Sequence, residues 1–294
     1  MPIVYETNFQ VRHYECDAYG HLNNAVYLSY MQESAYQASA AVGYDMVSYH
    51  QMDTVWLIRE TQVEYLLPVY YGDVLEVRTW VADFRRVRSK RMYEIRRQAS
   101  QELVCRGYSD WVYLDRQDER PRTIPVEMKA AFMPEHAKQA PAARQPFPAP
   151  PAPPPGVLKV RRQVEWRDLD PVRHVNNAVY AQYLQECGMQ LGQTYGWPAE
   201  RMWQEGFAIV ARSHHIEYLK PAFLGEQLEI LTWLSPFNRT NVVRHYLIRR
   251  ELDGELLTQV NSRYVWVDLD TGHPIRIPEK IKRDFASNVS EEVR

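Results

Sequence analysis

The sequence is poor in cysteine, in long apolar runs and in net charge, and each shortage excludes a class of protein. The three cysteines, Cys16, Cys105 and Cys187, are widely spaced and form no CxxC pair, which argues against a disulfide framework and a zinc site. Apolar runs such as residues 55–58 are only a few residues long, whereas a membrane-spanning helix needs about 20. A net charge of -2 gives no overall field toward nucleic acid or an anionic membrane. We therefore expect no nucleic-acid partner and no membrane span.

The first residues do not read as a signal peptide, and several common catalytic motifs do not occur in the sequence. Residues 1–7 lack the basic, apolar and small-residue order of a signal peptide, so we expect a cytoplasmic location. No Gly-rich phosphate loop, HExxH or GxSxG element occurs. What is present is an ordinary globular composition, with 45% hydrophobic and 24% charged residues. At about 150 residues per domain, a length of 294 residues suggests two domains.

A stretch rich in proline and alanine divides the chain. Residues 141–156 include the run Pro-Ala-Pro-Pro-Ala-Pro-Pro-Pro, which has little apolar bulk and few backbone donors. Such a stretch favours an extended, semi-rigid polyproline conformation. We interpret it as a linker that could run over the surface of one domain.

The segments on either side of the linker are copies of one another. Val11–Phe132 aligns without a gap to Val164–Phe285 at a constant offset of 153, with about a third of the positions identical. Each copy is long enough to bury a core of its own. The predicted organisation is an N-terminal domain of residues 1–136, a linker of residues 137–156 and a C-terminal domain of residues 157–294.

In each copy the spacing of apolar residues changes along the chain in the same order. A short extended start (Phe9–Tyr14, and Val164–Trp166 in the second copy) precedes a helix of about five turns, capped by Asn23 or Asn24 and ended by Gly43. Strand-like stretches rich in Val, Ile, Tyr and Trp follow, at roughly residues 54–67, 73–84, 90–99 and 103–114, each with a counterpart 153 residues on. One helix followed by an antiparallel meander predicts an α+β fold.

The segment just before the helix carries the candidate chemistry. Its intervening residues diverge between the copies, but an Asp, a His and two Asn stay the same: Asp17, His21, Asn23 and Asn24 in the first copy, and Asp170, His174, Asn176 and Asn177 in the second. A carboxylate and an imidazole at a helix N-terminus place a potential base beside backbone donors and the positive end of the helix dipole. That arrangement suits a reaction that develops an oxyanion. The alternative is that the Asp and Asn only cap the helix while the His packs.

The pattern Asp-x-x-x-His-x-Asn-Asn-x-x-Tyr before a long helix resembles the hot-dog-fold thioesterases, in particular the 4-hydroxybenzoyl-CoA thioesterase family and the acyl-ACP thioesterases. The run Trp166–Asp170 followed by His174 looks especially like the acyl-ACP branch. The resemblance covers both copies. It implies two tandem hot-dog domains, each a long helix wrapped by an antiparallel sheet, that pair as an intramolecular pseudo-dimer. Association of the tandem chain into a homo-oligomer is compatible with it.

The resemblance also implies roles for individual residues. Asp17 and Asp170 would be catalytic carboxylates that activate water or attack the thioester carbonyl, and His21, Asn23, His174 and Asn176 would orient the water or the thioester. Residues that would contact the substrate are Asn24, Tyr27, Arg59, Asn177, Tyr180 and Arg212. The substrate would be an acyl-CoA or acyl-ACP thioester. No metal or separate cofactor is implied, because coenzyme A or the acyl carrier protein arrives as part of the substrate.

The two copies differ around the candidate Asp and His. The first copy has Gly20 before its His, whereas the second has Arg173 there and Pro171 after its Asp. We expect these differences to alter the shape of the loop, which could leave one site weak or silent. Glu33 and its counterpart Glu186 lie within the predicted helices and are either a second base or partners of a strand arginine.

Three other interpretations stay open. A hot-dog hydratase or dehydratase also uses an Asp and a His, but residues 16–21 lack the Gly, Asn and Pro of its usual signature. A binding module would hold an acyl thioester without activating water. The basic run of residues 85–91 could bind the phosphates of coenzyme A or be a solvated turn.

Overall fold

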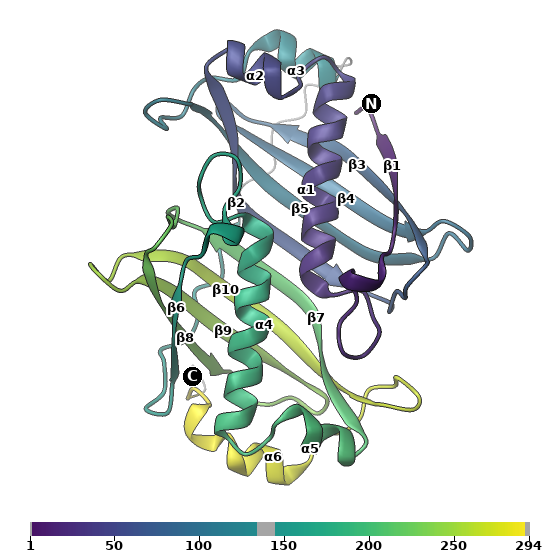
Figure 1. Cartoon of the computed structure of the whole chain (residues 1–294), viewed down its shortest axis with the longest axis vertical. Helices are drawn as coiled ribbons and strands as arrows, with labels where there is room; N and C mark the ends of the chain where they lie inside the picture. Colours follow the sequence, from purple (N-terminus) through teal and green to yellow (C-terminus); the bar gives the residue numbers. More distant parts are fainter. Residues whose placement is uncertain (1, 134–144, 292–294) are drawn as a thin grey trace. The chain divides into compact units, whose positions relative to one another are not determined.

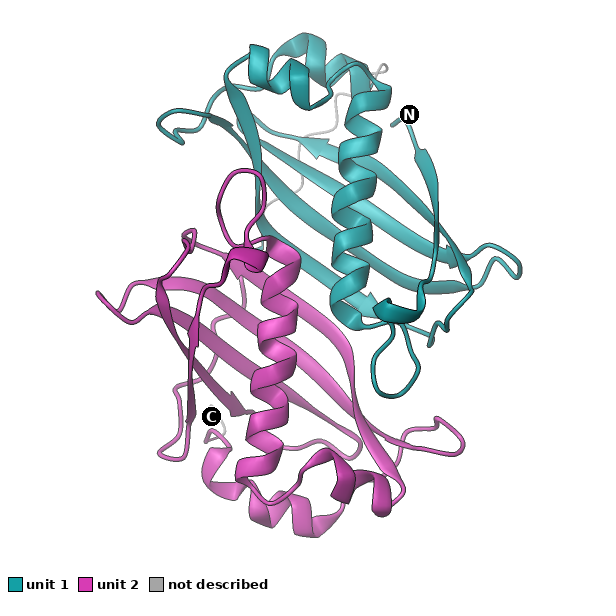
Figure 2. Ribbon diagram, viewed as in Figure 1, with its two compact units in different colours: residues 1–146 teal, residues 147–294 magenta. Residues whose placement is uncertain are grey.

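The computed structural model describes residues 2–133 and 145–291, which form two compact units, residues 1–146 and 147–294 (Figure 2). The end of the predicted first domain (134–136) and most of the predicted linker (137–144) lie outside the described residues. Residues 147–156, the remainder of the predicted linker apart from 145 and 146, belong to unit 2.

Unit 1 is a five-stranded antiparallel sheet with one long helix and two short ones. The long helix α1 (Asn24–Ala41) lies across one face of the sheet (Figure 1). The strands run in the order β1-β3-β4-β5-β2. Their bounds, with those of the short helices, are β1 Tyr5–Gln10, α2 Met46–Gln51, β2 Thr54–Tyr65, β3 Val74–Phe84, β4 Arg88–Arg97, β5 Leu103–Asp115 and α3 Val126–Phe132.

Unit 2 repeats this architecture. Its long helix α4 (Asn177–Thr194) crosses an antiparallel sheet of order β6-β8-β9-β10-β7. The other elements are β6 Leu158–Gln163, α5 Ala199–Gln204, β7 Phe207–Tyr218, β8 Gln227–Leu234, β9 Asn241–Arg250, β10 Leu256–Asp268 and α6 Glu279–Asp284. Each unit is therefore α+β, as the sequence predicts.

The long helices begin and end where the sequence predicts. Asn23 is the N-cap of α1, and its side chain accepts a hydrogen bond from the amide of Ala25 at 3.0 Å. After the C-cap Val42, Gly43 has a φ of +90°, a left-handed conformation that glycine adopts without strain. Tyr27, Met31 and Ala38 recur at helical spacing and are buried against the sheet.

The start of each copy differs from the prediction. Strand β1 ends at Gln10 and does not reach Tyr14, and β6 ends at Gln163, before the predicted Val164–Trp166. A 3-10 turn replaces the predicted extension in both copies. In unit 1 the carboxylate of Glu15 accepts a hydrogen bond from the amide of Arg12, which closes the turn and ends the extended conformation.

The predicted meander is correct only for three strands of each unit. In unit 1, β3, β4 and β5 are joined by successive hairpins, but β2 pairs with β5 rather than with β3. Strand β1 pairs with β3 on the other side. The edge position left beside β3 is thus filled by the segment that precedes the helix, which holds the candidate loop next to the sheet.

The described part of the linker lies against unit 2. The ring of Phe147 packs on His215 with centroids 4.6 Å apart, and the side chain of Asn261 donates to the carbonyl of Pro148 at 2.8 Å. At its end, the amide of Gly156 donates to the carbonyl of Ser287 at 3.0 Å. Among the described residues, no helix has the length and apolar character needed to cross a bilayer.

Candidate functional site

The loop before α1 is organised by the carboxylate of Asp17. Its Oδ1 accepts hydrogen bonds from the amides of Tyr19 at 2.9 Å and His21 at 3.2 Å. The backbone closes the same turn, because the Asp17 amide donates to the His21 carbonyl at 2.8 Å. Within the ranges that the structure describes, Oδ2 has no hydrogen-bond partner from the protein. One oxygen of this half-buried carboxylate therefore shapes the loop while the other stays available.

Asp170 repeats this arrangement before α4. Its Oδ1 accepts from the amides of Val172 at 3.0 Å and His174 at 3.3 Å, and its own amide donates to the His174 carbonyl at 2.9 Å. Partial burial raises the pKa of Asp170 above its ordinary value, an effect that the two backbone donors and the nearby His174 imidazole oppose. A carboxylate with a raised pKa is a stronger base once it is ionised.

The expected difference in loop shape between the copies is not found. Gly20 has a φ of +76° and Arg173 has a φ of +68°, so both chains take the left-handed conformation at this position. Gly20 donates its amide to the Asp17 carbonyl and Arg173 donates to the Asp170 carbonyl, each at 2.9 Å. The hydrogen bonds of the turn hold Arg173 in a conformation that costs a side-chain-bearing residue about 1–2 kcal/mol.

The histidines and asparagines of the motif lie beside these carboxylates. Each imidazole packs edge-on against an aromatic ring, His21 on Tyr70 and His174 on Phe223, with centroids 5.2 Å apart in both cases. Asn23 and its counterpart Asn176 are N-caps, whose side-chain oxygens accept from the amides of the second helical residues. The capping interpretation therefore holds for these Asn, whereas the Asp residues organise the loop and do not cap the helix.

The first residue of each long helix is hydrogen-bonded to a tyrosine at the end of a strand. The carbonyl of Asn24 accepts from the Tyr65 hydroxyl at 2.9 Å, and in unit 2 the carbonyl of Asn177 accepts from the Tyr218 hydroxyl at 3.0 Å. Tyr27 is only 3% exposed and stacks edge-on with Tyr65. In unit 2 the counterpart Tyr180 is equally buried and packs edge-on against Tyr218.

Burial raises the pKa of the Tyr27 and Tyr180 hydroxyls, which stay neutral. Their packing against the strand places both side chains in the core of their own units. The predicted contact of these tyrosines with substrate thus stays a prediction.

Arg59 and Arg212 lie at matching irregularities of the two sheets. In unit 1 the pairing of β2 with β5 passes from Ile58 to Glu60, so Arg59 is the extra residue of a β-bulge. In unit 2 the pairing of β7 with β10 likewise skips Arg212. Bulges redirect a side chain and are common beside active sites. The duplication has kept this feature in both copies, together with the arginine.

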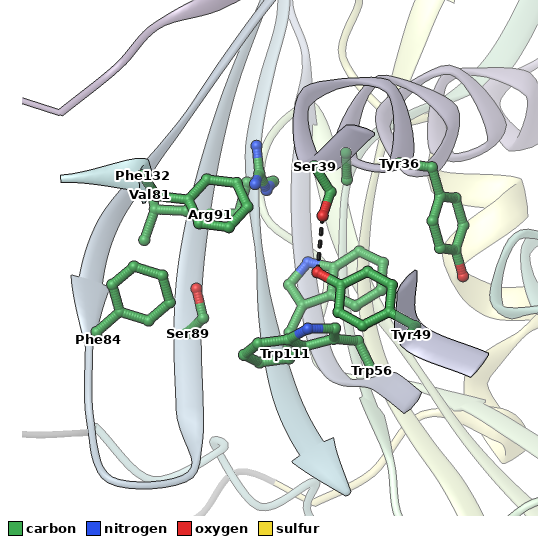
Figure 3. Close-up of a pocket in the computed structure, with 11 residues that line it drawn as sticks. Tyr36, Ser39, Tyr49, Trp56, Val81, Phe84, Ser89, Arg91, Trp111 and Phe132 are labelled. Atoms are coloured by element: carbon green, nitrogen blue, oxygen red, sulfur yellow. Dashed lines mark hydrogen bonds between the residues drawn. The ribbon is translucent and has the colours of Figure 1, made fainter. Parts of the chain in front are cut away.

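Unit 1 contains a pocket between α1 and its sheet, which encloses about 410 Å³ of empty space including the part open to solvent (Figure 3). Aromatic side chains from the helices and the strands supply most of its wall. The lining residues are Ala35, Tyr36, Ser39, Tyr49, Trp56, Val81, Phe84, Ser89, Arg91, Trp111 and Phe132. The lining is mainly apolar, with few polar groups, which is typical of small-molecule sites.

The polar side chains of the pocket differ in how well the protein satisfies their hydrogen bonds. The Ser39 hydroxyl donates to the Tyr44 carbonyl at 2.8 Å, so the Tyr49 hydroxyl, 2.7 Å away, donates to Ser39 Oγ (Figure 3). Burial raises the pKa of Tyr49 to about 12, which keeps this pair neutral. Arg91 differs, because the residue is 6% exposed and its guanidinium, among the residues that the structure describes, donates only a long 3.4 Å hydrogen bond to Thr79.

The equivalent region of unit 2 is filled. Arg244, the counterpart of Arg91, lies so close to α4 that a methyl group on Gly188 would be 2.5 Å from its Nη1. Its guanidinium also packs 4.9 Å from the ring centre of Tyr264. The carbonyl of Trp197 approaches Gly192 closely, at 2.7 Å from an added Cβ. Unit 1 has the larger residues Ala35 and Ser39 on its helix at these two positions.

The side chains of the basic run 85–91 have different surroundings in the structure, and a role in phosphate binding stays a prediction. Arg85 pairs with Asp83 at 3.4 Å, and Arg88 pairs with Asp110 at 3.4 Å. Arg91 points into unit 1. The two glutamates of the long helices, Glu33 and Glu186, are exposed, and Glu33 accepts a hydrogen bond from Gln37 at 2.8 Å.

Comparison with known proteins places this geometry in a family. The family model described as the Thioesterase-like superfamily matches residues 11–132 and again residues 164–285. The chain belongs to this superfamily. The two matched segments are the two copies found in the sequence, and each contains one Asp-His-Asn loop.

Two curated relatives match over very different shares of their own length. The acyl-[acyl-carrier-protein] hydrolase FATB2 of Cuphea viscosissima is 25% identical over 193 residues, which cover 63% of this chain and 47% of that protein. The chain thus spans about half the length of this relative. The long-chain acyl-CoA thioesterase FadM of Escherichia coli is 25% identical over 135 residues, which cover 45% of this chain and 99% of that protein.

Solved structures show that this chain has the tandem hot-dog fold. A putative oleoyl thioesterase from Lactobacillus plantarum superposes with a TM-score of 0.74 at 19% identity, covering 90% of this chain and 96% of that one. The 12:0-ACP thioesterase from Umbellularia californica gives a TM-score of 0.69 at 20% identity, covering 89% and 93%.

Sequence reasoning missed the pocket of unit 1. The sequence places Arg91 in the basic run 85–91 and does not set it apart from its neighbours. A signal was present in strand β4, because the alternation of buried residues puts Arg91 on the same face as Ser89 and Tyr93. The same alternation buries Arg244 in β9 of unit 2, so a charged side chain on the core face does not by itself distinguish the pocket from packed core.

Proposed function

We propose that the protein hydrolyses acyl-CoA or acyl-ACP thioesters, with Asp17 and Asp170 as the catalytic carboxylates. Membership of the thioesterase-like superfamily and the relatives' activities support the reaction type. The observation that carries the proposal is the shared geometry of the two Asp residues. Each carboxylate is fixed through Oδ1 by two backbone amides and leaves Oδ2 for the reaction.

The reaction needs no group beyond this loop and water. The Asp carboxylate takes a proton from water, the hydroxide oxygen bonds to the thioester carbonyl carbon, and the carbon–sulfur bond then breaks. The thiolate leaves and takes up the proton, so the products are a carboxylic acid and a thiol. A base positioned in this way contributes about 10²- to 10⁴-fold to the rate.

Direct attack of the carboxylate on the carbonyl carbon is the other route. It forms a mixed anhydride on Asp that water then hydrolyses. A single turnover in ¹⁸O-labelled water distinguishes the two routes, because only the anhydride route can leave the label on the Asp side chain.

The first test is thiol release from a panel of acyl-CoA and acyl-ACP thioesters. The variants are Asp17→Asn, Asp170→Asn and the double substitution, compared with the unchanged chain. Loss only in the double variant means two working sites, and loss in one single variant locates a sole active copy. Activity that survives the double substitution contradicts the mechanism. Tight binding without turnover in the unchanged chain supports an acyl-thioester binding module instead.

We propose further that the pocket of unit 1 receives the acyl group. Ser89 is a small residue on its wall, and its counterpart Val242 is fully buried in the filled core of unit 2. Ser89→Phe should lower kcat/KM for long acyl groups at least about tenfold and spare short ones, because it fills empty space. Val242→Phe should instead destabilise unit 2 by about 1–3 kcal/mol through overpacking. Equal kinetics for long and short acyl groups in the Ser89 variant would contradict this placement.

A further inference from the structure

Arg91 is the one charged side chain among the residues that line the pocket of unit 1. Its guanidinium carries five N–H donors, of which one makes a 3.4 Å hydrogen bond to Thr79 Oγ1. Over residues 2–133 and 145–291, no carboxylate lies within 4.0 Å ion-pair distance of it. The ring of Phe132, 5.3 Å from its central carbon, covers another side. The pocket thus contains a buried cation whose charge no protein group balances.

An unbalanced buried charge restricts what the pocket can bind well. A saturated acyl group that ends in a methyl would remove water from the guanidinium and return no hydrogen bond, which is unfavourable. A carboxylate has the opposite effect, because its two oxygens match the planar fork of an arginine and form a charge-assisted bidentate pair. The aromatic walls still suit the methylene chain that leads to such a carboxylate.

We propose that Arg91 recognises a carboxylate at the distal end of the acyl group, so that the preferred substrates are ω-carboxyacyl thioesters. The inference rests on the proposed thioesterase function, which it narrows to a substrate class. Arg91 is then a specificity-determining residue, remote from the bond that is cleaved.

The second copy supplies a matched control. Arg244 is equally buried, but it packs over the ring of Tyr264 and so closely against α4 that Gly188 could not carry a side chain there without a shift. An arginine kept only for packing should behave alike in the two copies. An arginine that binds a ligand should matter for selectivity in unit 1 alone.

The kinetic experiment compares pairs of acyl-CoAs of equal length, with and without an ω-carboxylate, from adipoyl- against hexanoyl-CoA up to hexadecanedioyl- against palmitoyl-CoA. The measured quantity is the ratio of kcat/KM for the two members of a pair. We expect the ratio to favour the ω-carboxyacyl member at the best length. Arg91→Met should lower that ratio about 10- to 100-fold, the loss expected for hydrogen bonds to a charged group.

Two further variants separate charge from packing. Arg91→Lys, which keeps the charge without the fork, should lower the ratio less than Arg91→Met does. Arg244→Met should leave the ratio unchanged, whatever it does to the melting temperature. A ratio that is near one in the unchanged chain, or that Arg91→Met does not alter, overturns the proposal.

A binding experiment keeps this test separate from the test of catalysis. Non-hydrolysable 2-oxoalkyl-CoA thioethers, with and without an ω-carboxylate, are titrated calorimetrically into the full chain. Tighter binding of the carboxylated analogue, lost in Arg91→Met, supports the site even if no thioester is hydrolysed. Equal Kd values in a chain that does hydrolyse acyl-CoA overturn the role of Arg91 and leave the thioesterase proposal standing. Because the unchanged chain is itself compared on both analogues, the result does not depend on the folding of any variant.

Discussion

Replacing Asp170 with asparagine should separate the chemistry of the loop from its architecture. Oδ1 of Asp170 accepts from the amides of Val172 and His174, and an asparagine oxygen can accept the same two bonds. Burial raises the pKa of Asp170, so the ionised carboxylate is disfavoured in the folded state. The stability that this group contributes is present below its unfolded pKa and is lost as the pH rises through the folded pKa. Near neutral pH, Asp170→Asn should therefore be at least as stable as the unchanged chain.

The alanine variant at the same position gives the scale of the structural contribution. Asp170→Ala loses both hydrogen bonds, at about 1 kcal/mol each, so the free energy of unfolding should fall by about 2 kcal/mol. For a unit of this size, each kcal/mol lowers the melting temperature by about 2–4 °C, so the expected decrease is about 4–8 °C. Both variants lose the base, and the activity of this copy should fall about 10²- to 10⁴-fold in each.

The assay combines calorimetric melting with thiol release in a chain that already carries Asp17→Asn, so that only the second copy is measured. The reasoning predicts an inactive, stable asparagine variant and an inactive, less stable alanine variant. An asparagine variant that melts as low as the alanine variant refutes the structural part. An asparagine variant that keeps the thiol release of its parent refutes the chemical part.

Three further predictions concern the pH response and two glycines. In the chain carrying Asp17→Asn, kcat/KM should fall on acidification with an apparent pKa above the ordinary value for Asp, because burial raises the pKa of Asp170; a pH–rate profile tests this. Gly20→Ala should cost about 1–2 kcal/mol of stability from its φ of +76° alone, because an added Cβ meets nothing within 4 Å; a melt equal to that of the unchanged chain would contradict this. Gly192→Ala should cost about 1–3 kcal/mol, because its Cβ would lie 2.7 Å from the Trp197 carbonyl oxygen, and urea unfolding measures the loss.

The elements that the sequence predicts best are those fixed by neighbours in the chain. Helix α1 begins at the N-cap Asn23 and ends before the left-handed Gly43. Both signals depend on contacts within a few residues, so both ends can be predicted from the sequence. The turn before the helix depends instead on side chains that reach elsewhere. The Glu15 carboxylate, for example, closes its turn and accepts a hydrogen bond from Tyr30 on the helix at 2.7 Å. Such a turn is not visible in local periodicity, and the strand was therefore extended too far.

Sheet order and the pocket escaped prediction for a similar reason. The pairing of β2 with β5 joins residues about fifty positions apart, and no turn signal records it. The candidate carboxylates can be recognised in the sequence because both copies keep the Asp while the residues around it differ. The pocket has no such signature, since its lining comes from seven elements and its small and large residues differ between the copies.

The two copies are alike in the loop before the long helix and differ in the core beneath that helix. The loop that holds the Asp carboxylate is the same in both, down to the left-handed residue at Gly20 and Arg173. Under the helix they differ, because Gly188 and Gly192 allow the close approach of Arg244 and Trp197 in unit 2, whereas Ala35 and Ser39 line a pocket in unit 1. A duplicated chain can thus keep the same Asp loop in both copies while the core of one copy opens into a pocket. The fold tolerates this because each unit has a sheet and a core of its own, so the cost of an open pocket in the first falls on the packing of that unit alone.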